Sequence, residues 1–345
     1  LNQNTGTLKH VANTGGVWTV STVDNSMDFI APTAVAADRS GNSHVAYRSD
    51  ETNPNVKYAT NASGAWVISI VDTNGTLGTN SALALDRAGN VHITYYDRIR
   101  KDLKYATNTS GTWVTTTVDA KGDVGLAASI VVDGDGRVHI SYRYATGGDL
   151  KYATNASGTW VTTTVDANWN VGEYTSIGVS GIGGVKAPGI HISYYDVTRR
   201  DLKYATNSPA GKWSTETVDS GGDVGRFTSL VADTNGSVSI SYYDVTRADL
   251  KYATNVSGSW VLTVIDSTGD SGKYASLARD PLGKFHIAYY DSIISALRSA
   301  SDSSGTWRTE TGDGVSAGQG ASIDAIVPSL PLPSPSPPPP HGPHG

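Results

Sequence analysis

The chain has 345 residues, a net charge of -6 and no cysteine, which excludes disulfides and thiolate metal sites. Its 26 lysines and arginines are scattered instead of forming the dense basic stripe that neutralises phosphates, so nucleic acid is not an expected partner. No apolar run approaches the roughly 20 residues needed to span a bilayer, and only three Phe and one Met are present, which disfavours a helical bundle.

A repeat of 47 or 48 residues runs through the chain, with one longer interval of 53. A fixed period of this length predicts a repeat architecture. Each unit carries an apolar-basic pair, then a tryptophan, then an aspartate six positions after the tryptophan. The tryptophans are Trp18, Trp66, Trp113, Trp160, Trp213, Trp260 and Trp307, and the aspartates are Asp24, Asp72, Asp119, Asp166, Asp219, Asp266 and Asp313.

Each repeat divides into four short segments of alternating apolar and polar residues, separated by Gly, Asn and Asp turns. This pattern predicts a four-stranded antiparallel unit, whose strands we name A to D in chain order. The chain begins with C and D strands at Leu8 and Trp18, continues through six sets of four, and ends with an A strand near residues 321–323. Such units repeated around an axis form an all-β propeller, and seven repeats predict seven blades over residues 1–327.

The turn between strands C and D contains Asn, Gly and Ser or Thr before the tryptophan. It resembles a relaxed form of the Asp-box, the turn found in extracellular propellers of the sialidase kind, with Asn in the acidic position. The resemblance covers residues 8 to about 326 and implies a propeller fold. The asparagines are Asn61, Asn108, Asn155, Asn207 and Asn255.

The seventh blade would combine C and D strands from the N-terminus with an A strand from the C-terminus, and it would lack a B strand. An unfilled slot exposes unpaired backbone groups that can accept a strand from another chain. Residues 328–345 are rich in Pro and Ser and should form an extended polyproline II tail. A head-to-tail contact through the slot and the tail would generate a filament.

The D-to-A and B-to-C loops of a propeller share one face, where tyrosine and aspartate side chains form a candidate sugar-binding rim. Aromatic faces stack on sugar rings and carboxylates bind hydroxyls, although turn capping and packing between blades would explain the same residues. The candidate ligand-binding residues are Tyr96, Asp97, Asp123, Tyr195, Asp196, Asp223, Tyr243, Asp244, Asp270, Tyr290, Asp291, Arg48 and Arg143, together with Trp169, which is the one tryptophan outside the repeat frame.

Two further residue classes point to structure more than to chemistry. Histidines recur at one position of strand B, and equivalent positions in different blades are too far apart to share a metal ion, so we expect buried, hydrogen-bonded side chains and no metal or cofactor. Asparagine sequons are by-products of the turns that are also available for sugar attachment. The histidines are His44, His92, His139, His191 and His286, and the sequons are Asn61, Asn74, Asn108, Asn155, Asn235 and Asn255.

The sialidase resemblance implies three clustered arginines and a Tyr-Glu pair. Arg48 and Arg143 replace the second tyrosine of strand B, but no third arginine stands at the equivalent place and no glutamate completes the pair. Glycoside hydrolysis needs two carboxylates in unlike environments, whereas similar blades give similar environments.

We therefore predict a non-catalytic, extracellular or cell-surface module that binds a glycan or another surface ligand multivalently. The alternatives are a subunit of a filament, which self-associates through the incomplete blade and the tail, and a sialidase-like hydrolase.

Overall fold

The computed structural model describes residues 7–14, 17–25, 33–49, 55–73, 77–181, 189–207 and 211–316. These residues form strands joined by turns, and they contain no helix long and apolar enough to cross a membrane. The strands are β1 (Leu8–Thr14), β2 (Val17–Asp24), β3 (Ala34–Ala37), β4 (Ser43–Arg48), β5 (Val56–Thr60), β6 (Val67–Asp72), β7 (Leu77–Leu85), β8 (Val91–Asp97), β9 (Asp102–Thr107), β10 (Val114–Asp119), β11 (Val124–Val132), β12 (Val138–Tyr144), β13 (Asp149–Thr154), β14 (Val161–Asp166), β15 (Val171–Ser180), β16 (Gly189–Asp196), β17 (Asp201–Asn207), β18 (Trp213–Asp219), β19 (Val224–Ala232), β20 (Val238–Asp244), β21 (Asp249–Thr254), β22 (Val261–Asp266), β23 (Ser271–Arg279), β24 (Phe285–Asp291), β25 (Ala296–Ser301) and β26 (Arg308–Ser316).

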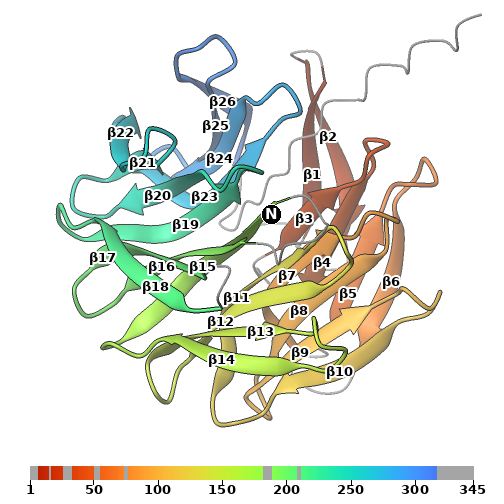
Figure 1. The fold of residues 1–345 in the computed structure, drawn as a ribbon. Coiled ribbons are helices and arrows are strands. Elements are labelled where there is room, and N and C mark those ends of the chain that lie inside the picture. Colours follow the sequence, from red (N-terminus) through yellow and green to blue (C-terminus); the bar gives the residue numbers. More distant parts are fainter. Residues whose placement is uncertain are drawn as a thin grey trace, which may run out of the picture.

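The described strands form a propeller of six four-stranded antiparallel blades, each with its strands in chain order, and one two-stranded sheet, β1–β2. The four-stranded unit is confirmed, but the prediction of seven blades is wrong. The tryptophan period counts C–D hairpins, whereas a blade also needs A and B strands, and only six pairs of those are described. The first strand of each blade lies on the inside of the ring (Figure 1).

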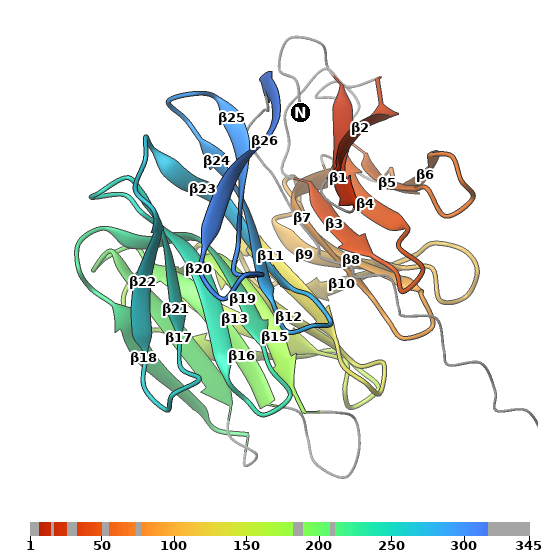
Figure 2. The same cartoon turned by 90° about the horizontal axis from the view of Figure 1, so that it is seen from above.

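The β1–β2 hairpin occupies the position of a C–D pair beside the first blade, β3–β6. Leu8 and Val23 pack against Val45 and Tyr47 of that blade. On its other side β2 makes a limited contact with β26 of the last blade, and Figure 2 shows the hairpin standing between the first and last blades. The expected A strand near residues 321–323, the domain boundary at residue 327 and the tail at 328–345 lie outside the described residues.

Two turn motifs set the ends of strand B. In the A–B turn of the second blade, the Asp86 carboxylate accepts the N–H groups of Ala88 and Asn90, and Gly89 takes a φ of 84° that favours glycine. In the C–D turn, the Asn108 side-chain oxygen accepts the Val91 N–H at 2.7 Å. Asparagine is therefore used in the Asp-box-like turn to fix the start of the B strand beside it.

A buried tyrosine-aspartate bond joins each four-stranded blade to the hairpin or blade that precedes it. The first tyrosine of strand B donates its hydroxyl to the aspartate that ends the preceding D strand, as Tyr242 does to Asp219 at 2.7 Å. Lys251 of strand C donates to the same Asp219 oxygen. Burial alone would raise the pKa of Asp219, but these hydrogen bonds hold it below its ordinary value. The six pairs among the described residues are Tyr47–Asp24, Tyr95–Asp72, Tyr142–Asp119, Tyr194–Asp166, Tyr242–Asp219 and Tyr289–Asp266.

A second contact between blades uses the repeat histidines and tryptophans. His139 bonds the Tyr152 hydroxyl at 2.6 Å, and the Tyr152 ring meets the Trp213 ring of the next blade edge to face at 5.2 Å. His44, His92, His139 and His191 are buried and hydrogen-bonded, which confirms the structural role expected of them; His286 is less buried and lies 3.2 Å from Asp280.

We expect Asp219→Asn to destabilise the propeller by about 3 to 5 kcal/mol, because it removes the nearer carboxylate from the charged, nearly buried Lys251 and leaves it only the longer contact with Asp244 at 3.8 Å. Urea unfolding of the two proteins measures the difference. Asp135→Asn is the matched control, since Asp135 forms an exposed pair with Arg137 and its loss should cost about 1 kcal/mol or less. Equal losses in the two variants would contradict a special role for the buried bond.

Burial lowers the pKa of His191 to about 4, against an ordinary value near 6.5. The unfolded chain therefore binds a proton between pH 6.5 and 4 that the folded chain does not, and stability falls as the pH drops through this window. Within this window, each such histidine lowers the free energy of unfolding by up to roughly 1.4 kcal/mol for each pH unit of acidification.

His191→Ser should reduce this pH dependence and keep the tyrosine bond, because Ser239 stands at the equivalent place of β20 and bonds the Tyr252 hydroxyl at 2.7 Å. Unfolding free energies measured from about pH 7 to 4.5 test this. An unchanged slope in the variant would show that His191 does not carry the effect.

Candidate functional site

The four aspartates at the ends of strand B are turn caps. Asp196, for example, accepts the N–H groups of Thr198 and Arg199 at 2.9 Å. Their side chains are enclosed by the B–C turns that they stabilise, which agrees with the turn-capping alternative considered for them. The four, at 0 to 2% exposure, are Asp97, Asp196, Asp244 and Asp291.

The second tyrosines of strand B are also buried, and three of them reach the D–A loop of the next blade. Tyr195 donates its hydroxyl to Asp223 at 2.8 Å, as Tyr96 does to Asp123 and Tyr243 to Asp270. These tyrosine faces are not open to a ligand, and neither is that of Tyr290, which is 8% exposed.

Asp123, Asp223 and Asp270 are partly exposed at this face, and each pairs with a cation. Lys101 lies 3.2 Å from Asp123, Arg226 lies 3.1 Å from Asp223, and Lys273 lies 2.5 Å from Asp270. Ion pairs of this kind offer both donors and acceptors to a polar ligand.

The two rim arginines stand apart. Arg48, on β4 of the first blade, is 2% exposed. Arg143, on β12 of the third blade, donates to Glu173 at 2.8 Å and to Asn170 at 2.7 Å, both in the fourth blade. The second blade separates them, so they do not form the arginine cluster that a sialidase-like site would require.

Trp169 is 61% exposed in the loop between β14 and β15. Its indole lies 5.1 Å from the Arg199 guanidinium, and its φ of 74° is in the left-handed region. Gly122, Gly222 and Gly269 occupy the same place in other blades with positive φ. A tryptophan at a position suited to glycine is costly, which points to a use for the exposed indole.

An aromatic cluster that the sequence reasoning missed lies on the innermost strands of three consecutive blades. The Phe227 ring of β19 lies 4.7 Å from Tyr174 of β15 and 4.5 Å from Tyr274 of β23. All three are partly exposed. We call Tyr174, Phe227 and Tyr274 the axial aromatic arc, since the strands that carry them face the axis of the ring (Figure 1).

The arc depends on a bulge at the start of each inner strand. The β19–β20 register shifts on both sides of Arg226, and Phe227 has a φ of 53°. The preceding Gly225 lies so close to the previous blade that a Cβ there would be 2.7 Å from the Leu202 Cα. Tyr174, Tyr274 and Ala127 share this backbone, with φ of 53°, 55° and 50°.

Left-handed conformations cost bulky residues roughly 1 kcal/mol or more each, so three aromatic rings there are an outlier that suggests function. Aligning the repeats on Val-Gly or Ser-Gly at the start of strand A places Ala, Tyr, Phe and Tyr in one column. That column is the signal in the sequence that could have revealed the cluster, because alanine is replaced by aromatic residues at positions with the same backbone conformation.

The structure shows that the rim residues are buried or paired with other groups of the chain. The sugar-binding role of each rim residue therefore stays a prediction. The asparagine sequons also stay predictions. Asn61, Asn108, Asn155 and Asn255 hold the start of strand B through their side-chain oxygens, Asn235 is exposed in an A–B turn, and Asn74 lies outside the described residues.

Comparison with known proteins supports the fold. No family model and no curated protein matches the sequence, so the Asp-box family is not confirmed. Among solved structures, the chain is similar to AofleA from Arthrobotrys oligospora, with a TM-score of 0.59 and 15% identity over 93% of this chain and 94% of that one. It is also similar to a point mutant of Aleuria aurantia lectin in complex with α-methyl-L-fucoside, with a TM-score of 0.55 and 13% identity over 81% and 94%.

A polysaccharide lyase, the ulvan lyase of family PL25 bound to -[GlcA(1-4)Rha3S]-, is more distant, with a TM-score of 0.50 and 13% identity over 83% of this chain and 84% of that one. Similarities at this level of identity establish the propeller fold, and its occurrence in both a lectin and a lyase leaves the activity to be argued from the site.

We expect Trp169→Gly to change the free energy of unfolding by no more than about 1 kcal/mol. The variant removes the strain of a tryptophan in the left-handed backbone conformation, and it also loses an exposed cation–π contact. These two effects have similar size and opposite sign. Chemical denaturation measures the sum. A loss of several kcal/mol would instead identify Trp169 as a structural cover.

Proposed function

We propose that this protein is a non-catalytic carbohydrate-binding module whose main sugar platform is the axial aromatic arc. The observation that carries the proposal is the placement of Tyr174, Phe227 and Tyr274 in left-handed bulges on three adjacent inner strands. Aromatic faces offer apolar area for the C–H face of a sugar ring.

Polar groups beside the arc can read the hydroxyls of a sugar. The Arg226–Asp223 and Lys273–Asp270 pairs stand on or just before the strands that carry Phe227 and Tyr274. Burial raises the pKa of Tyr174 and of Tyr274, so both phenols stay protonated at neutral pH and act as hydrogen-bond donors.

The similarity to a lectin in complex with a fucoside supports a sugar ligand, and the similarity to a polysaccharide lyase bound to its saccharide is compatible with one. A non-catalytic role fits the local chemistry better than hydrolysis does. The partly exposed carboxylates of Asp223 and Asp270 are held by cations and tyrosine hydroxyls, whereas glycoside hydrolysis needs one carboxyl group that stays protonated beside one that does not. An extracellular or cell-surface location is part of the proposal, since a glycan-binding module meets its ligands there.

Self-association is a second candidate role, favoured by one observation. Among the described strands β1 and β2 form a sheet of two strands only, and a small sheet of this kind can accept a strand from a neighbour. Sedimentation of the purified chain separates the two roles, because a binding module can act as a monomer whereas a filament subunit must assemble with concentration.

Phe227→Ala should weaken glycan binding at least about tenfold, equivalent to about 1.4 kcal/mol. Ala127 already occupies the same bulge in β11 with a φ of 50°, so the fold should accept the change. A glycan array that includes α-methyl-L-fucoside identifies the ligand, and titration calorimetry then compares the variants.

Leu282→Ala is the control, because Leu282 is 73% exposed in an A–B turn at the opposite end of the propeller. Failure of the native protein to retain any glycan would overturn the carbohydrate proposal. Retention with unchanged affinity in Phe227→Ala would place the site elsewhere.

A further inference from the structure

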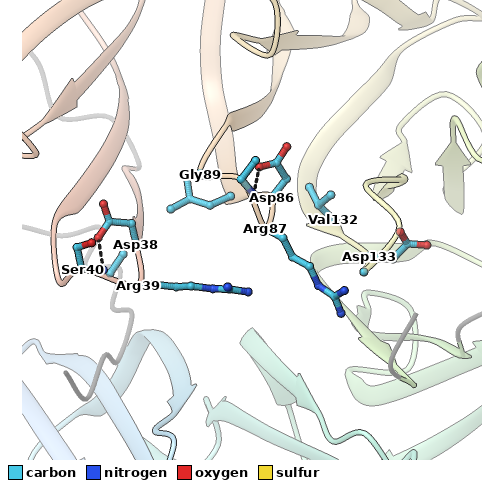
Figure 3. A pocket seen from close by; sticks show the side chains of 12 residues that line it. Asp38, Arg39, Ser40, Asp86, Arg87, Gly89, Val132 and Asp133 are labelled. Atoms are coloured by element: carbon cyan, nitrogen blue, oxygen red, sulfur yellow. Dashed lines mark hydrogen bonds between the residues drawn. The ribbon is translucent and has the colours of Figure 1, made fainter. Parts of the chain in front are cut away.

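A pocket of about 550 Å³ opens at the other end of the propeller, among the A–B turns of the first three blades. The turns β3–β4, β7–β8 and β11–β12 line it, so it lies at the far ends of the inner strands from the axial aromatic arc. Figure 3 shows the side chain of Arg39 extending from its turn toward the one that carries Arg87, and Arg87 extending toward the turn of Asp133.

The carboxylates in the pocket wall are committed to their own turns. Asp38 accepts the N–H groups of Ser40 and Asn42 and the Asn42 side-chain amide at 2.8 to 2.9 Å. Asp86 makes the equivalent bonds to Ala88 and Asn90. Asp133 in the third turn likewise accepts two backbone N–H groups and contacts a histidine.

Arg39 and Arg87, by contrast, are exposed and form no hydrogen bond or ion pair within the described part of the chain. Each guanidinium carries five N–H donors in a planar fork that matches two acceptor oxygens. Arg137, the arginine of the third turn, is already paired with Asp135 at 3.1 Å.

The two arginines also depart from the repeat. The residue after the turn aspartate is Gly134 in the third blade, Thr234 in the fifth and Pro281 in the sixth. The turn therefore does not need arginine, and its presence in two adjacent blades is not a by-product of the repeat.

We propose that this pocket is a second binding site, which takes an anionic group with two or more free oxygens, a carboxylate or a sulfate, between Arg39 and Arg87. Bidentate bonds from a guanidinium to such groups are among the stronger hydrogen bonds in proteins. The site is independent of the axial aromatic arc and goes beyond the neutral sugar recognition proposed for it.

Titration with glucuronate and with inorganic sulfate at low ionic strength, followed by NMR or calorimetry, tests the proposal and shows which oxyanion is preferred. The native protein should bind one of them, and added NaCl should weaken the binding. Arg39→Ala and Arg87→Ala should each lower the affinity about three- to tenfold, and the double variant more than about tenfold. Lys at both positions should restore part of the affinity, since it keeps the charge and loses the fork.

Arg98→Ala is the matched control, because Arg98 is an exposed arginine in a B–C loop at the opposite end. Phe227→Ala should leave anion binding unchanged, so failure at the arc and failure at this pocket are distinguishable. Absence of binding to the native protein, or equal affinity in the native protein and the double variant, would overturn the proposal. Unchanged melting temperatures would show that the variants are folded, as expected for exposed side chains.

Discussion

The propeller depends on a carboxylate that ends one blade and is held by the next. Each of the aspartates from Asp24 to Asp266 accepts a hydroxyl from a tyrosine that is itself fully buried. In five blades a lysine or arginine of strand C, next to the tyrosine's strand, forms an ion pair with this aspartate. In the second blade the equivalent Lys104 donates to Thr117. Because burying one partner alone would be costly, each four-stranded blade is matched to the hairpin or blade that precedes it, and the described blades are joined by pairwise contacts along the chain.

Because the same contacts join each pair of blades, the sequence was most informative about the features that recur in every repeat. Trp, Asp and the apolar-basic pair recur because each makes the same contact in each blade, so period and turn chemistry predicted the four-stranded unit and the role of His139 and its equivalents. The number of blades was not predictable in the same way. Trp18 and Trp113 each mark a C–D hairpin. The hairpin of Trp113 is part of a four-stranded blade, whereas the hairpin of Trp18 forms a sheet of only two described strands.

The site was predicted less well, for a physical reason. A tyrosine or aspartate near a loop reads the same in sequence whether it faces solvent or its own turn, and Asp196 and Tyr195 turned out to face inward. The exposure of Trp169 was predicted because this tryptophan stands outside the repeat frame, and its role as a ligand contact stays a prediction. Phe227 and its neighbours were missed because their exposure depends on a bulge, in which a glycine allows close approach to the previous blade and a residue shortly after it takes positive φ. Neither effect is visible in an alternating pattern of apolar and polar residues.

In a molecule built this way, function is expected where equivalent positions stop being equivalent. The inner strands share one backbone, yet rings stand on three of them and alanine on a fourth; the A–B turns share one set of hydrogen bonds, yet arginine follows the aspartate in only two of the described turns. Both departures lie at the ends of the strands that surround the axis, and neither replaces a residue of the buried tyrosine-aspartate bonds. A repeat scaffold can therefore present two chemically different surfaces at opposite ends, aromatic rings at one and arginines at the other, because the buried tyrosine-aspartate bonds that join the described blades involve neither set of side chains.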